Sequence, residues 1–220
     1  MGLIDPRLAA ALEIQFARRQ AALAAGAERV GWKLGVGASE RIGGQWAVGN
    51  LTSATRLESG AEYLAGDHLA LHADAEVALE LAADVSADAD RDEAVTSIAG
   101  YGTALELVDL EGTDEDPEKI VADNVFHRAY ALSPLDRALP PDGVRGRLII
   151  NGQVRAAGPA EQDLGELVRW AAVVLGAMGE RLLAGDRLIT GSVVQVAVAS
   201  GDVVVADLGA LGRVRLTIAQ

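Results

Sequence analysis

The stretch LHADAEVAL, residues 71–79, is the segment around which the predicted fold is built. It alternates between polar and small apolar side chains, a pattern typical of a β-strand, in which residues two apart point to the same face. Asp74 and Glu76 therefore lie side by side on one face of this strand. Two like charges at that spacing repel each other, so the pattern indicates a cation or a proton between them.

A third acid lies in a second apolar segment, YGTALELVD, residues 101–109. This segment also reads as a buried strand, and Glu106 within it needs a partner. Three carboxylates on adjacent strands would suit Mg²⁺ or Mn²⁺, which prefer oxygen ligands. An alternative stays open from spacing alone: an acidic pair on a strand is often its solvated face, with Ala73, Ala75 and Val77 pointing inward.

Lys33 is the basic residue that points most directly to function. The chain takes its basic residues almost entirely as Arg, and its two lysines are Lys33 and Lys119. Lys119 follows an acidic stretch, whereas Lys33 lies in the apolar, glycine-flanked segment VGWKLGVG, residues 30–37. Burying an unpaired ammonium group costs several kcal/mol, so Lys33 predicts an acidic partner in the core or in a cleft. A structural ion pair is the alternative to an active-site role.

The remaining pattern predicts an α+β fold in one domain over 1–220, with an N-terminal helix and lid region at 1–60 and a strand-rich core at 61–220. Helices are expected at about 5–25, 88–100 and 164–178, strands at 31–36, 69–81 and 101–110, loops at 39–55 and 114–118, and several short strands over 187–219. The Asn151-Gly152 pair predicts a tight hairpin between 147–150 and 153–156. Residues 120–132 fit helix or strand equally well.

Composition excludes several classes of function. The net charge of −13 argues against binding to nucleic acids or anionic membranes, which both need a basic face. The absence of Cys excludes disulfides, thiolate zinc sites and Cys nucleophiles. No secretory signal pattern and no apolar stretch of membrane-spanning length is visible. We therefore expect a cytoplasmic protein with no nucleic-acid or membrane partner, and the composition does not indicate what it binds.

Taken in order, these segments resemble the fumarylacetoacetate hydrolase superfamily, and most closely its 2-keto-4-pentenoate hydratase branch. The resemblance extends over nearly the whole chain and depends on the order and spacing of short motifs rather than on any single one. The motifs are GWKLG at 31–35, DAEVA at 74–78, ALELVD at 104–109, ADN at 122–124, NG at 151–152, LAGD at 183–186, TGS at 190–192, GD at 201–202 and ADLG at 206–209.

This resemblance implies a mixed β-roll, barrel-like fold of the fumarylacetoacetate hydrolase C-terminal type, assembled as a homo-oligomer. It implies that Mg²⁺ or Mn²⁺ binds at Asp74, Glu76 and Glu106 and that Lys33 is the active-site lysine. We also expect Thr190, Gly191 and Ser192 to form a substrate-binding loop and Asp123 to orient pocket groups. The branch's typical reaction adds water to 2-hydroxypenta-2,4-dienoate during the breakdown of aromatic compounds.

The chain departs from this branch around the expected substrate. The first metal position is Asp74 where the superfamily usually has Glu, which is one methylene longer. The lid region is short, the Gly-His-Pro expected within 158–165 is missing, and residues 125–128 are bulky. These departures leave a 2-oxo acid decarboxylase open as an alternative. A C–C bond hydrolase is disfavoured because no His precedes His68 to form the lid's His–Glu pair, and a non-catalytic relative is the remaining alternative.

Overall fold

The computed structural model describes residues 5–37, 39–42, 44–66, 70–110, 116–135 and 143–220. Within these ranges the helices are α1 (Pro6–Ala24), α2 (Arg91–Thr96), α3 (Pro117–Ala122) and α4 (Leu164–Ala177), with short 3₁₀ turns η1 (Ser39–Ile42), η2 (Ser53–Thr55) and η3 (Gly209–Leu211). No helix among the described residues is long and apolar enough to cross a membrane.

The described residues contain twelve strands, which form two mixed sheets. They are β1 (Arg29–Gly35), β2 (Ala47–Thr52), β3 (Arg56–Leu57), β4 (Glu62–Leu64), β5 (Leu71–Leu81), β6 (Ile98–Asp109), β7 (His127–Leu132), β8 (Arg145–Ile150), β9 (Gln153–Pro159), β10 (Arg187–Ala197), β11 (Val203–Asp207) and β12 (Arg213–Ala219). The larger sheet has the order β2-β1-β10-β5-β6-β7-β3, and the smaller has the order β4-β12-β11-β8-β9.

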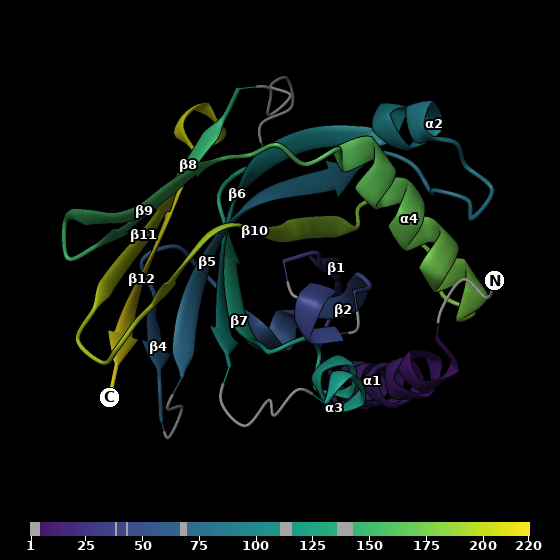
Figure 1. The fold of residues 1–220 in the computed structure, drawn as a ribbon, viewed down its shortest axis with the longest axis horizontal. Helices are drawn as coiled ribbons and strands as arrows, with labels where there is room; N and C mark the ends of the chain where they lie inside the picture. Colours follow the sequence, from purple (N-terminus) through teal and green to yellow (C-terminus); the bar gives the residue numbers. More distant parts are fainter. Residues whose placement is uncertain (1–4, 38, 43, 67–69, 111–115, 136–142) are drawn as a thin grey trace.

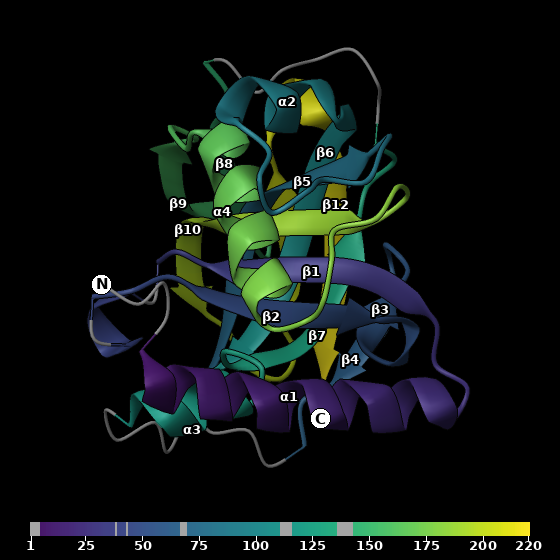
Figure 2. The same cartoon turned by 90° about the vertical axis from the view of Figure 1, so that its right-hand side faces the viewer.

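The two sheets and the helices form the layers of the fold. In Figure 1 the five-stranded sheet lies at the left and α1 and α4 at the right, with the seven-stranded sheet curling between them. Figure 2 shows α4 in front of β1, β2 and β10, with α1 running across the bottom of the view below β2. This mixed, curled arrangement with few helices confirms the predicted α+β fold.

Local sequence signals explain where the long helices begin. The Asp5 side chain accepts a hydrogen bond from the backbone N–H of Arg7, and Pro6 occupies the first turn of α1, where its missing N–H is tolerated. At α4, Asp163 caps the backbone N–H of Glu166 in the same way. The apolar side of α4 then packs into the main core through residues such as Val168 and Leu175, which are fully buried.

Three local predictions were wrong. Residues 39–55 were expected as a loop or lid, but the range contains strand β2, which pairs with β1 and is buried along its whole length. Residues 190–192 were expected in a loop, but they lie within β10. The helix expected over 88–100 ends at Thr96, and β6 starts at Ile98. The ambiguous segment 120–132 divides into the end of α3 and strand β7, and the loop expected at 114–118 lies partly outside the described residues.

Candidate metal centre and active site

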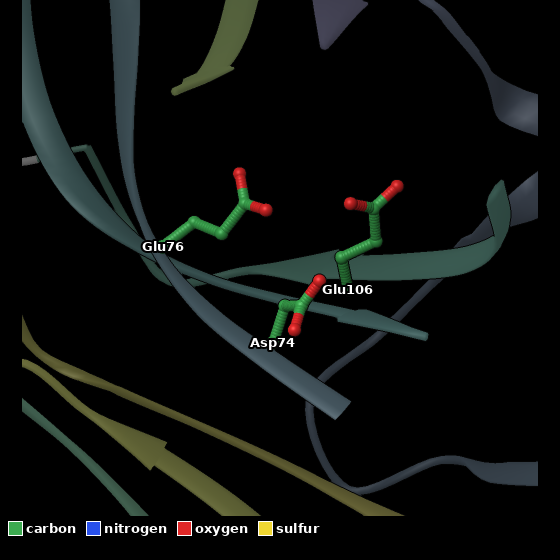
Figure 3. Close-up of side chains that lie close together, drawn as sticks. All are labelled: Asp74, Glu76 and Glu106. Carbon is green, nitrogen blue, oxygen red and sulfur yellow. The ribbon is translucent and has the colours of Figure 1, made fainter. Parts of the chain in front are cut away.

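Asp74 and Glu76 lie on β5, and Glu106 lies on the neighbouring strand β6. The strands pair antiparallel with Asp74 directly opposite Glu106, so all three side chains share one face of the sheet. Each residue offers a carboxylate oxygen, and these oxygens lie within 4.8 Å of one another. Figure 3 shows the three carboxylates pointing toward a common space. They form a group that can hold a divalent cation.

The acidic face of β5 is not solvated. Asp74, Glu76 and Glu106 are only 5%, 2% and 1% exposed. On the opposite face of the strand, Ala73 and Ala75 are completely buried in the main hydrophobic core. Strand β5 is therefore covered on both faces, which rules out the alternative that its acids are a surface pair.

The pKa values of Asp74 and Glu76 are raised, because both acids are buried where little positive charge compensates them. Burial, reinforced by the charge of Glu106, raises the pKa of Asp74 to about 7. Burial also raises the pKa of Glu76 well above its ordinary value, and the charges of Glu106 and Asp74 add to the effect. Three buried carboxylates cannot all ionise beside one ammonium group, so the site binds either protons or a cation. The donor set fits Mg²⁺ or Mn²⁺.

Lys33 reaches this group from β1 and is itself only 3% exposed. Its Nζ lies 2.5 Å from Oε1 of Glu106 and donates a hydrogen bond of 2.8 Å to the carbonyl of Val125. The acidic partner that the sequence required for Lys33 is therefore Glu106. Because both groups are buried, removing either one leaves the other without its oppositely charged partner.

A second donor binds the same oxygen of Glu106. Nδ1 of His127 lies 2.6 Å from Oε1, and Nε2 of His127 lies 2.9 Å from Oγ1 of Thr55. Burial alone would raise the pKa of Glu106, but Lys33 and His127 outweigh it, and the pKa is lowered. Burial lowers the pKa of His127 despite its contact with Glu106. These shifts favour the ionised form of Glu106 and the neutral form of His127.

Strand β10 holds the other two acids in place. The backbone N–H of Gly191 donates to Oε2 of Glu76 at 2.8 Å, and the Ser192 hydroxyl donates to Oδ1 of Asp74 at 3.1 Å. The pairing of β10 with β5 shifts register between Ile189 and Ser192, and Gly191 adopts a φ of +92° there. This irregularity turns an N–H away from the sheet ladder toward a carboxylate.

A backbone turn with unusual geometry supports the lysine. Asn124, Val125 and Phe126 have φ values of 58°, 53° and 66°, in the left-handed region that non-glycine residues rarely adopt. Asn50 stabilises the turn: its backbone N–H donates to Oδ1 of Asn124 at 2.7 Å. The Asn124 amide in turn donates to the carbonyl of Asn50 at 3.0 Å. The strained turn directs the Val125 carbonyl at Lys33.

A cavity of about 340 Å³ opens beside the acids, within the usual range for small-molecule sites. Its described lining includes the three acids, Lys33, Gly191 and Ser192, together with apolar side chains such as Val36, Val108 and Phe126. Arg41 is the second cationic side chain among the described residues of this lining, and its Cζ lies 4.8 Å from the centre of the Phe126 ring. The cavity is therefore acidic around the three carboxylates and has a guanidinium group elsewhere on its wall.

Two of the residues expected at the substrate lie elsewhere. Asp123 forms ion pairs with Arg18 at 3.5 Å and Arg128 at 3.0 Å and is absent from the described lining of the cavity. Thr190 is fully buried beneath the lining, and its hydroxyl donates to the carbonyl of Val77 at 3.1 Å. Gly191 and Ser192 do line the cavity, but from a strand rather than from a loop.

Sequence reasoning missed three contributors to this site. From the sequence, a packed or exposed position for His127 is favoured over one lining the pocket, and no spacing rule connects it with Glu106, 21 residues away. Arg41 lies in a glycine-rich stretch without a clear pattern. The carbonyl of Val125 carries no side-chain signal at all. The bulky side chains at 125–128, a departure from the branch that the sequence resembles, were the available sign that this segment differs from that branch.

The profile of the fumarylacetoacetate (FAA) hydrolase C-terminal family matches residues 45–219. The chain belongs to this family. The matched region contains the three acids and β10, whereas Lys33 and Arg41 lie before it.

Solved structures with the same fold include three enzymes of different reaction types. A 4-oxalocrotonate decarboxylase from Pseudomonas putida G7, complexed with magnesium and adipate, has a TM-score of 0.86 and 21% identity, with 96% of this chain and 86% of that chain covered. A 5-carboxymethyl-2-hydroxymuconate delta-isomerase from Mycobacterium smegmatis has a TM-score of 0.69 and 21% identity, covering 87% and 79%. A fumarylpyruvate hydrolase from Pseudomonas aeruginosa, complexed with Mn²⁺ and pyruvate, has a TM-score of 0.68 and 14% identity, covering 87% and 90%.

Proposed function

We propose that residues 1–220 form one catalytic domain of a metal-dependent lyase that hydrates 2-hydroxypenta-2,4-dienoate or a similar 2-oxo or enol acid. The observation that carries this proposal is the group formed by Asp74, Glu76 and Glu106, with Lys33 bonded to one member, all lining a single cavity. Magnesium and manganese in the related structures support Mg²⁺ or Mn²⁺ as the cofactor.

The donor set defines what chemistry is available. A divalent ion held by the three carboxylates would supply Lewis acidity toward the carboxylate and 2-oxygen of a 2-oxo acid. The chain itself contributes the positions of the ligands: Gly191 fixes Glu76, Ser192 fixes Asp74, and Lys33 contacts Glu106. The apolar wall around Val108 and Phe126 excludes water from the hydrocarbon part of a substrate.

Lys33 is the group that we propose as the proton carrier for the enol system. Its Nζ donates to Glu106 and to the Val125 carbonyl, so it is held at the wall of the cavity beside the acids. In the hydration, a proton and a hydroxyl group from one water molecule add across a carbon–carbon double bond, and 4-hydroxy-2-oxopentanoate forms. Proton transfer of this kind requires a side chain within hydrogen-bonding reach of the substrate.

Decarboxylation of a 2-oxo dicarboxylic acid is the second candidate function. Two observations favour it: the guanidinium group of Arg41 in the cavity wall, and the high TM-score with the decarboxylase. Arg matches a carboxylate with two parallel hydrogen bonds, and the typical hydratase substrate has no second carboxylate for it to bind. Hydrolysis of a C–C bond is less well supported, because His127 is bonded to Glu106 and Thr55 and is absent from the described cavity lining.

Two assays on one preparation test the proposal. Freshly generated 2-hydroxypenta-2,4-dienoate is followed by its ultraviolet absorbance with Mg²⁺ and with EDTA, and 4-oxalocrotonate is followed by release of CO₂. Rapid, EDTA-sensitive loss of the dienoate with 4-hydroxy-2-oxopentanoate as product supports the hydratase. Metal-dependent release of CO₂ without hydration supports the decarboxylase. No turnover of either compound would contradict both functions and support a non-catalytic relative.

The remaining expectations about cellular context stay predictions. We propose that the chain assembles as a homo-oligomer, as the family resemblance implies, and that it works in the cytoplasm on a product of aromatic breakdown. Light scattering coupled to size-exclusion chromatography measures the first directly. A single-chain mass in that experiment would contradict the predicted assembly.

A further inference from the structure

Glu106 is held differently from the other two acids. Asp74 and Glu76 each accept hydrogen bonds from β10, through Ser192 and Gly191. Glu106 instead accepts from Lys33 and His127, and both donors converge on Oε1. The Lys33 contact is 2.5 Å long and the His127 contact 2.6 Å, both shorter than the roughly 2.7–2.9 Å usual for charge-assisted N–H···O bonds.

The hydrogen-bond pattern fixes the tautomer of His127. Oε1 of Glu106 already accepts from the Lys33 ammonium group, so Nδ1 of His127, 2.6 Å from the same oxygen, is placed to donate to it. In the tautomer with the proton on Nδ1, Nε2 is an acceptor, and the Thr55 hydroxyl, 2.9 Å away, is placed to donate to it. The direction of donation then runs from Thr55 to His127 to Glu106. Each member has a partner, which is the condition for a buried polar network to be rigid.

The surrounding strands hold this network in place. His127 opens β7, which pairs antiparallel with β6, the strand of Glu106. Thr55 ends the 3₁₀ turn η2, directly before β3, and β3 pairs parallel with β7. His127 is 6% exposed, so water does not compete for its ring nitrogens. The network thus connects the edge of the seven-stranded sheet to the acidic group.

We propose that His127, oriented by Thr55, is a positioning residue for the metal centre: it fixes Oε1 of Glu106 so that the other carboxylate oxygen faces the cation. His127 also donates a hydrogen bond to Oε1 that does not depend on Lys33. Lys33 can therefore exchange its contact with Glu106 for one with substrate. This inference rests on the metal centre of the proposed function. Outer partners of metal ligands typically change metal affinity about 10- to 100-fold when removed.

Isothermal titration of the metal-free protein with Mn²⁺ tests the inference without any substrate. His127→Leu removes both ring nitrogens, and its dissociation constant for Mn²⁺ is expected to rise about 10- to 100-fold. In His127→Asn the side-chain amide nitrogen takes nearly the position of Nδ1, so it retains the donor to Glu106. We expect this conservative variant to regain most of the affinity. If Leu and Asn weaken binding equally, or if neither does, His127 acts only by packing and the inference is wrong.

A pair of variants at Thr55 provides the test that does not disturb the core. Thr55→Val keeps the shape but removes the hydroxyl that selects the tautomer, whereas Thr55→Ser keeps the hydroxyl. Weaker Mn²⁺ binding by Thr55→Val but not by Thr55→Ser supports the network. Equal Mn²⁺ affinities of the two variants overturn the inference, even if the His127 variants do not fold. If the parent binds no Mn²⁺, both the metal centre and this inference fail. If it binds Mn²⁺ but turns over no 2-oxo acid, only the proposed reaction fails.

Discussion

Nζ of Lys33 lies 2.5 Å from Oε1 of Glu106, although the strands that carry them, β1 and β6, are not neighbours in the sheet. Strands β10 and β5 separate β1 from β6. In a flat sheet, three strand spacings of about 4.8 Å would place the two backbones roughly 14 Å apart. The sheet therefore curls so that side chains from its two halves meet inside the curve. The ion pair closes this curve, and the carboxylates of Asp74 and Glu76 lie beside it.

Replacing Lys33 is expected to affect both turnover and stability. Lys33→Met removes the proposed proton carrier and leaves Glu106 without its cationic partner. Breaking a buried ion pair typically destabilises a protein by about 3–5 kcal/mol. We expect turnover to fall at least about 100-fold, as for loss of an acid–base group, and the metal-free protein to melt at a lower temperature.

Lys119 provides the matched control, because it is the other lysine and is exposed. Lys119→Met changes the net charge equally and should leave kcat and melting temperature unchanged. Parent-like kcat in Lys33→Met would remove Lys33 from the mechanism.

Neutral substitutions at the acids should weaken metal binding. Glu76→Gln and Glu106→Gln each remove one charge from the set that faces the cation, and titration calorimetry with Mg²⁺ should show much weaker binding. Glu80→Gln is the control: Glu80 lies on the same strand but pairs with Arg187 at 2.9 Å. The assigned ligands would be wrong if the Glu80 variant and the two site variants had equal affinities.

Stability of the metal-free protein should fall as the pH rises. The pKa of Asp74 is raised from 3.8 to about 7, so between these values the folded state binds more protons than the unfolded state. The free energy of unfolding therefore decreases across this pH window. The stabilisation that the protonated Asp74 gives to the folded state is lost as the pH rises through about 7. Mg²⁺ should stabilise the protein more at high pH, because it replaces those protons.

Thermal melts in EDTA and in Mg²⁺, from acidic to mildly alkaline pH, measure both effects. Asp74→Asn cannot ionise, so its metal-free melting temperature should depend less on pH. An equal slope for the parent and this variant would show that Asp74 is already ionised in the folded protein.

The space around Lys33 makes Gly49 sensitive to substitution. A Cβ at Gly49 would lie 2.5 Å from Cγ of Lys33 and 2.7 Å from Oδ1 of Asn124, closer than real Cβ contacts. Gly49→Ala should therefore displace the lysine from Glu106. Displacements of about 1 Å can reduce turnover about 100-fold, so kcat should fall more than Mn²⁺ affinity. Gly37→Ala, where a Cβ meets nothing within 4 Å, is the control, and equal kcat for the two variants would refute this argument.

The sequence predicted those parts of the site that depend on local pattern. Asp74 and Glu76 share a face because strands have a period of two, and the apolar surroundings of Lys33 required an acidic partner. The helices α1 and α4 and the hairpin at Asn151 follow from periodicity, caps and turn chemistry.

The sequence could not predict contacts that arise from pairing between distant strands. Gly191 contacts Glu76, 115 residues away, because of an irregularity between β10 and β5. A glycine-rich segment also indicated a loop at 39–55, where β2 is stabilised by pairing with β1 rather than by its own propensity. Thr55 reaches His127 only because β3 adds to β7 at the sheet edge.

Arg41 should distinguish dicarboxylic from monocarboxylic ligands. The probes are 2-oxoadipate and 2-oxohexanoate, which have equal chain length and differ in one terminal carboxylate. If Arg41 binds that carboxylate, Arg41→Gln should weaken 2-oxoadipate binding to the Mn²⁺-loaded protein about tenfold or more and leave 2-oxohexanoate nearly unchanged. Arg155→Gln, an exposed position on β9, controls for the change in net charge.

Tighter binding of 2-oxoadipate by the parent, lost only in the Arg41 variant, would favour the decarboxylase over the hydratase. Equal binding of both compounds by the parent would remove Arg41 from substrate recognition and leave the hydratase as the better-supported function.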